Sequence, residues 1–121
     1  MKRVTLYTKS GCTSCQKARQ FLLARGVHFA ERDIFKHPLD ERELRALAAQ
    51  KPLAELFSHR SPSVKALGLA DKALTDDEML RYMLQEPRLI RRPLLRGEDE
   101  VVVGFDEARL GALASLQSAH G

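Results

Sequence analysis

The sequence predicts an α/β protein with a single mixed sheet of four strands. Three observations predict it: a strand–helix–strand pattern at the N-terminus, a helical middle, and two further strands before a last helix. A length of 121 residues suits one domain, residues 1–121. Apolar residues make up 44% of the chain and charged residues 30%, which excludes disordered and collagen-like classes.

The first third of the chain reads as a βαβ unit. Residues 2–7 alternate in polarity and contain β-branched and aromatic residues, so they predict a strand, and residues 8–11 are typical of a turn. A helix is expected from Cys12 to the stop at Gly26, and its apolar side is formed by Cys15, Ala18 and Leu22. Residues 28–34 predict a second strand, with a right-handed crossover between the two.

The middle of the chain predicts a helical insert. Asp40 and Glu43 have the spacing of a capping box, and so do Thr75 and Glu78. The first of these helices ends at Pro52, and a short apolar turn follows over residues 53–57. A short helix over residues 61–68 lies between them, and the second capped helix ends before Pro87.

The last third returns to strands. Residues 89–95 and 100–104 predict two strands, and residues 96–99 between them have the composition of a hairpin turn. Asp106 is the expected cap of a final helix, whose apolar positions are Leu110, Leu113 and Leu116. The polar residues 117–121 are expected to form a loose tail.

Charge and hydropathy narrow the function classes. The 20 basic and 16 acidic residues give a net charge of +4, which fits an anionic substrate or a nucleic-acid-associated partner and requires neither. With two Tyr, five Phe and no Trp, the chain offers few platforms for stacking on single-stranded nucleic acid. There is no apolar run of roughly 18 residues and no apolar signal core, so a cytoplasmic location without membrane contact is predicted.

The two cysteines form a Cys-x-x-Cys pair, Cys12 and Cys15. A structural zinc site would need two further ligands, and the four histidines have no paired spacing to supply them, so no metal is predicted. At the start of a helix the Cys12 sulfur lies near unpaired backbone N–H groups that stabilise a thiolate, and Lys9 adds positive charge. Cys15 lies one turn deeper, so we expect Cys12 to attack and Cys15 to resolve. The alternative is a pair of buried small apolar side chains.

Four arginines lie within residues 88–96, among residues typical of a strand. One interpretation is a solvated strand edge that resists pairing with other chains. That interpretation is weaker for Arg92, which directly precedes Pro93 in a bond that could be cis and would fix the backbone there. A fixed guanidinium suits an oxyanion because it offers a rigid fork of donors. Arg60 is a further candidate, although its spacing alone indicates a surface arginine.

These residues resemble a small thioredoxin-fold family that joins glutaredoxin-coupled arsenate reductases with Spx-type redox regulators of RNA polymerase. The resemblance covers nearly the whole chain, and its motifs are residues 7–15, Arg60-Ser61, residues 75–77, residues 89–95 and Val103-Gly104. It implies a thioredoxin-like fold: a four-stranded mixed sheet with flanking helices and a helical insert.

By this resemblance the chain is a cytoplasmic thiol oxidoreductase, most specifically an arsenate reductase. Cys12 would attack arsenate or a similar oxyanion, and Cys15 or an external thiol would release arsenite. The resemblance implies no bound cofactor, and an external reductant, thioredoxin or glutathione with glutaredoxin. The oxyanion would be held by side chains and by the backbone of the Cys12 turn: Arg60, Arg92, Pro93 as a cis-proline, Gly11, Thr13 and Ser14.

Two features of the sequence are closer to the regulators. The arsenate reductases have a third arginine after the final strand, whereas residues 101–105 contain none, so Arg91 or Arg96 stands as a substitute. The second cysteine of the pair and the setting of Arg60 are also Spx-like. The alternative is therefore an Spx-like regulator that binds the RNA polymerase α subunit without contacting DNA directly, with Cys12–Cys15 as a disulfide switch.

Overall fold

The computed structural model describes residues 4–97 and 100–120, with side chains as far as residue 113. The chain forms two compact units. The first consists of Met1–His37 with Arg92–Gly121, and the second is the intervening segment Pro38–Arg91. The single domain over residues 1–121 stays a prediction, and each unit is described by itself below.

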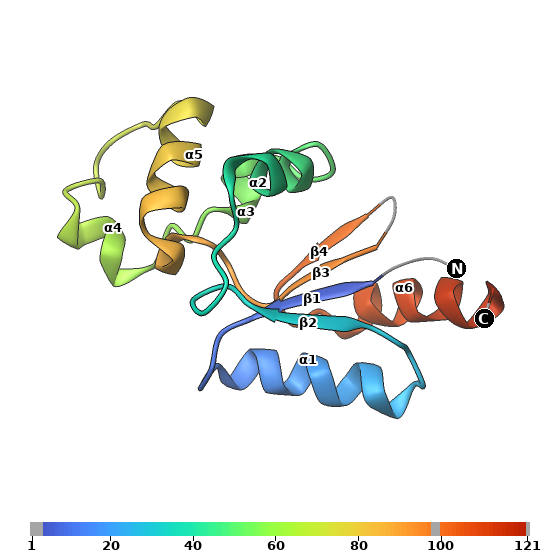
Figure 1. The fold of residues 1–121 in the computed structure, drawn as a ribbon. Coiled ribbons are helices and arrows are strands. Elements are labelled where there is room, and N and C mark those ends of the chain that lie inside the picture. The colour runs from blue at the N-terminus through green and yellow to red at the C-terminus, as the bar shows by residue number, and fades with distance from the viewer. Residues whose placement is uncertain (1–3, 98–99, 121) are drawn as a thin grey trace. The chain divides into compact units, whose positions relative to one another are not determined.

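The first unit contains a four-stranded sheet (Figure 1). Its strands are β1 (Thr5–Thr8), β2 (Ala30–Asp33), β3 (Leu94–Arg96) and β4 (Val101–Val103), in the order β2-β1-β3-β4. β1 pairs with β2 in parallel and with β3 antiparallel, and β3 pairs antiparallel with β4. The predicted mixed sheet is confirmed.

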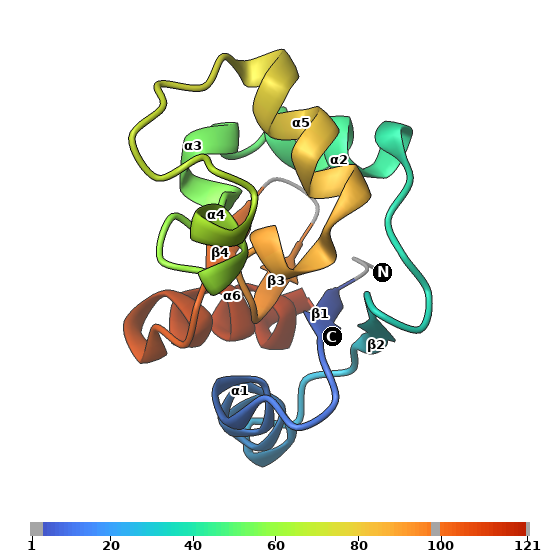
Figure 2. The same ribbon diagram turned by 90° about the vertical axis from the view of Figure 1, so that its left-hand side faces the viewer.

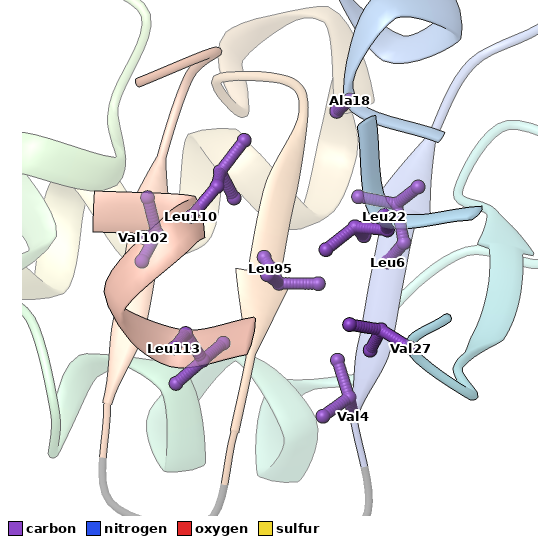
Figure 3. Packing of buried hydrophobic residues seen from close by; sticks show 9 residues of the cluster. All are labelled: Val4, Leu6, Ala18, Leu22, Val27, Leu95, Val102, Leu110 and Leu113. Carbon is purple, nitrogen blue, oxygen red and sulfur yellow. The ribbon is translucent and has the colours of Figure 1, made fainter. Parts of the chain in front are cut away.

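Two helices, α1 (Thr13–Ala24) and α6 (Glu107–His120), supply the rest of the core of this unit. The sheet register places Leu6, Leu95 and Val102 opposite one another, so they form one apolar row across three strands. Figure 3 shows this row packed with side chains of both helices in a single buried cluster: Ala18, Leu22, Leu110 and Leu113, with Val4 and Val27 beside them. Because both helices share this cluster, they cover the same face of the sheet, and α1 is held rigidly with the cysteines at its start.

The second unit is built of short helices (Figure 2). They are α2 (Glu41–Ala48), α3 (Leu53–Leu56), α4 (Pro62–Ala66), α5 (Asp76–Gln85) and the 3₁₀ turn η1 (Pro87–Leu89). Both predicted capping boxes are present, at the N-termini of α2 and α5. Among the described residues there is no helix with the length and apolarity needed to cross a membrane.

Several predicted boundaries were wrong. Residues 89–95 are not one strand: η1 ends at Leu89, Ile90 makes an isolated bridge to Phe57, and β3 begins only at Leu94. The physical reason is proline, because Pro87 favours the start of a helical turn and Pro93 has no N–H to donate to a ladder.

The second predicted strand is also shorter than expected, since Val27 still donates to Leu22 in the cap of α1 and pairing begins at Ala30. The loose tail over residues 117–121 was wrong in that α6 runs to His120. No proline or glycine interrupts the helix after Gly111, so its backbone hydrogen bonds continue.

Residues 2 and 3 of the first predicted strand, and residues 98 and 99 of the predicted hairpin, lie outside the described residues. On either side of residues 98 and 99, the Gly97 N–H donates to the Glu100 carbonyl at 2.8 Å.

Candidate active site

The two cysteines occupy the first turn of α1, as predicted. A turn precedes them, closed by a 3.2 Å hydrogen bond from the Cys12 N–H to the Lys9 carbonyl. Gly11 has a φ of +80°, a conformation that suits glycine at the third position of such a turn. Cys12 is the N-cap, and its Sγ accepts a hydrogen bond of 3.3 Å from the backbone N–H of Cys15. The sulfur thus takes the place that a serine or aspartate oxygen usually fills.

The two thiols differ in exposure. Cys12 is partly exposed, whereas Cys15 is completely buried, and both are free thiols. The pKa of the Cys15 thiol is raised from 9.0 to about 12, chiefly by burial and next by its side-chain hydrogen bond with Cys12. A backbone hydrogen bond with Lys9 and the positive charge of Arg92 oppose this rise. Cys15 is therefore a protonated thiol at neutral pH, directly behind an accessible Cys12.

The loop before Cys12 is anchored to the end of β2 by one carboxylate. Asp33 accepts hydrogen bonds from the N–H and the hydroxyl of Ser10, at 3.1 and 3.0 Å. It also accepts from the N–H groups of Phe35 and Lys36, at 2.8 and 3.2 Å. These bonds stabilise the carboxylate and hold the pKa of Asp33 at about 2, with the Phe35 bond contributing most. Asp33 was not among the residues predicted from the sequence, although an aspartate at a strand end, two residues before the N–H it binds, is a turn signal.

A second anchor joins α1 to the sheet. The guanidinium of Arg19 binds both carboxylate oxygens of Glu31, and the Thr8 hydroxyl donates to the same carboxylate at 3.1 Å. The Arg19 contact lowers the pKa of Glu31 and raises that of Arg19. Because a bidentate pair fixes orientation as well as distance, it sets the position of the helix one turn beyond Cys15.

The predicted oxyanion-binding residues divide between the two units. Gly11, Thr13, Ser14, Arg92 and Pro93 belong to the first unit with the cysteines. Thr13 and Ser14 are exposed in the first turn of α1, where N–H groups lack acceptors within the helix. The Arg92–Pro93 bond is cis, as the sequence analysis expected, and the charge of Arg92 acts on Cys15.

Arg60 and Arg91 lie in the second unit. Arg60 is exposed, just before the N-cap of α4, and Arg91 donates to the Glu55 carbonyl at 3.4 Å. Their part in binding an oxyanion stays a prediction. Within residues 4–97 and 100–120, no group of three or more His, Cys, Asp or Glu side chains could hold a metal ion.

Known proteins identify the family. The model described as "ArsC family" matches residues 7–113, which span the Cys-x-x-Cys turn, the whole second unit and the first half of α6. The chain belongs to the ArsC family. The resemblance stated from the sequence is confirmed, and so is the thioredoxin-like fold class.

Relatives within this family carry two kinds of name. The chain is 37% identical to the global transcriptional regulator Spx of Enterococcus faecalis, over 86% of this chain and 80% of that protein. It is 29% identical to the regulatory protein MgsR of Bacillus subtilis, over 98% and 96%. A solved structure from Streptococcus mutans, described as a possible arsenate reductase, is 29% identical with a TM-score of 0.74, and the match covers 87% of this chain and 92% of that one.

Proposed function

We propose that this ArsC-family protein carries out reversible thiol–disulfide chemistry, with Cys12 as the attacking thiol and Cys15 as the resolving thiol. The observation that supports it is the asymmetry of the pair: Cys12 is accessible at a helix N-terminus, while Cys15 is sealed behind it and hydrogen-bonded to its sulfur. Such a pair protects the second thiol until the first has reacted. Two buried thiols would have favoured a packing role instead.

For an enzyme, the reaction we propose is the reduction of arsenate. The Cys12 thiolate attacks arsenic(V), and a hydroxyl group of arsenate leaves, takes up the proton that Cys12 has released and departs as water, so a sulfur–arsenic bond replaces an arsenic–oxygen bond. The sulfur of Cys15 then attacks the Cys12 sulfur, and the electron pair of the sulfur–arsenic bond passes to arsenic, which leaves as arsenite. The Cys15 proton goes to the departing arsenite, so two thiols and arsenate yield arsenite, water and a disulfide.

The residues proposed to hold the oxyanion are positively charged or carry helix N–H groups. The positive charge of Arg92 acts on Cys15, and the N–H groups of Thr13 and Ser14 lie in the first turn of α1. Fixed donors of this kind contribute strongly to catalysis because they require no reorganisation as charge develops. The proposed cycle uses no bound metal or organic cofactor. An external thiol of the cytoplasm, thioredoxin or glutathione with glutaredoxin, reduces the disulfide or replaces Cys15 as the resolving thiol.

A second candidate function has its own support. The relatives named above as regulators match 80% or more of their own length. We propose as the alternative that the Cys12–Cys15 disulfide is a redox switch in a regulator that binds the RNA polymerase α subunit and does not contact DNA itself.

Coupled assays of arsenate-dependent NADPH oxidation test the enzyme. They use thioredoxin with its reductase in one arm, and glutathione with glutaredoxin in the other. Turnover is expected in one arm, and Cys12→Ser should abolish it. Arg92→Ala should lower kcat/KM for arsenate about a hundredfold, as removal of a preorganised donor does. Arg88→Ala is the matched control, since Arg88 is exposed and pairs with Glu86 in the other unit.

If neither arm shows arsenate-dependent oxidation of NADPH, the arsenate reductase proposal is overturned. A pull-down with the polymerase α subunit then tests the alternative, with reduced protein, oxidised protein and Cys15→Ser. The regulator requires capture that differs between the reduced and the oxidised wild type, and Cys15→Ser, which cannot form the disulfide, should be captured like the reduced wild type. Equal capture in all three samples would exclude the switch.

A further inference from the structure

One aromatic ring contacts two cations beside the dithiol. Phe35 lies in the turn that follows β2, and the Nζ of Lys9 is 4.9 Å from its ring centroid. The guanidinium carbon of Arg92 is 5.3 Å from the same centroid. Both distances are within the range in which the ring quadrupole attracts a cation. A single side chain therefore holds positive charges from two segments that are more than eighty residues apart in the sequence.

The turn that carries this ring is fixed by hydrogen bonds. The Ile34 N–H donates to the Thr8 carbonyl at 3.0 Å, which continues the pairing of β1 and β2. The Asp33 carboxylate accepts from the Phe35 N–H and also binds Ser10, immediately after Lys9. The Phe35 backbone is thus tied to the same loop that leads into Cys12.

The residues that carry the two cations are both connected to the cysteines, Arg92 through its charge and Lys9 through its backbone. The charge of Arg92 favours the thiolate form of Cys15, so its guanidinium lies within electrostatic reach of the pair. The backbone of Lys9 contacts both cysteines: its carbonyl accepts from the Cys12 N–H, and it forms a backbone hydrogen bond with the Cys15 thiol. Both charges therefore meet at the Phe35 ring, one carried by the loop that leads into Cys12 and the other acting on Cys15.

We infer that Phe35 is a positioning residue that gathers Lys9 and Arg92 beside the dithiol, so that Cys12 reacts with anionic partners in preference to neutral ones. This rests on the proposed use of Cys12 as the attacking thiol. It extends that proposal by naming an aromatic side chain, rather than a charged one, as a determinant of the charge class of the partner.

The test compares two alkylating agents of similar size and opposite charge class. The rate of Cys12 alkylation in the reduced protein is measured with iodoacetate, an anion, and with iodoacetamide, which is neutral. The ratio of the two rates reports the local positive potential and cancels changes in accessibility and in thiolate content. Phe35→Leu should lower the ratio about threefold, because a lost cation–π contact corresponds to a factor of this order. Phe35→Tyr keeps the ring and should retain the ratio of the wild type.

Charge variants and salt make the test specific. Lys9→Met should lower the ratio of the two alkylation rates in the wild type. It should lower the ratio less in the Phe35→Leu background, because there Lys9 has already lost its cation–π contact with the ring. The difference between wild type and Phe35→Leu should shrink as salt is added, since screening weakens charge effects and leaves packing unchanged. Phe35→Met, of similar volume, replaces the leucine variant if circular dichroism shows that the latter does not fold.

The inference is overturned if Phe35→Leu or Phe35→Met keeps the wild-type ratio, or if Phe35→Tyr loses it as fully as Phe35→Leu. These outcomes are separate from failure of the proposed function. The alkylation ratio depends on neither arsenate, Cys15 nor a reductant. If arsenate is not reduced but the alkylation ratio depends on the Phe35 ring, only the arsenate reductase proposal is excluded. If arsenate is reduced but the ratio does not depend on the ring, only the role of Phe35 is excluded.

Discussion

Replacing Cys12 with serine leaves Cys15 as the single thiol of the chain, and that thiol should be nearly inert in the folded protein. Cys15 has no exposed surface, and α1, which carries it, is packed into the core through Ala18 and Leu22. Burial is the largest cause of the raised pKa of Cys15, and it persists in the Cys12→Ser variant. The hydrogen bond with the Cys12 thiol is the second cause of the raised pKa, and it is lost.

The size of the effect follows from the thiolate, which is the form that alkylating agents attack. A rise in the pKa of Cys15 from 9.0 to about 12 lowers its thiolate fraction at neutral pH by three powers of ten, about a thousandfold. Allowing for loss of the thiol–thiol hydrogen bond, the folded Cys12→Ser variant should react at least about a hundredfold more slowly than the same chain in denaturant.

The assay is alkylation by iodoacetamide at neutral pH, followed by mass spectrometry of the tryptic peptides. Cys12→Ser is measured folded and in denaturant, and Cys15→Ser, which keeps the accessible thiol, is the matched control. Folded Cys12→Ser that reacts within about tenfold of its unfolded rate would refute the reasoning, because Cys15 would then be neither sealed nor held protonated.

The same thiol gives a pH dependence of stability with a definite sign. The pKa of Cys15 is higher in the folded chain than in the unfolded one, so the folded state holds the proton more tightly. The contribution of this thiol to the free energy of unfolding is fully present below about pH 9 and is lost as the pH rises toward 12. Denaturant unfolding of Cys12→Ser against Cys12→Ser/Cys15→Ser should therefore show a difference in free energy that changes only in this alkaline range.

Two further predictions concern the scaffold. Leu22→Ala removes a fully buried side chain and should lower the free energy of unfolding by about 3–5 kcal/mol, whereas Leu23→Ala, at a position 61% exposed, should change it by less than about 0.5 kcal/mol. Equal losses in denaturant unfolding would contradict the core assignment. Asp33→Asn should speed hydrogen exchange of the Ser10 amide. In the wild type the hydrogen bonds of the Asp33 carboxylate are fully present above its ordinary pKa of 3.8 and are lost as the pH falls toward 2. If exchange of the Ser10 amide is unchanged in Asp33→Asn, the carboxylate does not hold the loop.

Local signals in the sequence accounted for much of the fold. The capping boxes that begin α2 and α5 were predicted because each is a contact between residues three positions apart. Cys12 as the residue at the start of α1 was predicted from the turn residues 8–11 before it and the helical pattern of apolar residues after it. Strand prediction failed over residues 89–95, where the pattern of apolar side chains indicated a strand and two prolines prevented continuous pairing.

The sequence by itself determined most of the elements and which cysteine begins α1, since helix caps, turn glycines and the spacing of Cys12 and Cys15 act within one or two turns of chain. Only the tertiary structure decided what surrounds that thiol. Phe35 meets Lys9 and Arg92, and Asp33 meets Ser10, because β1 pairs with both β2 and β3. Neighbours of this kind depend on how distant segments close on one another, and no local pattern of residues encodes that closure.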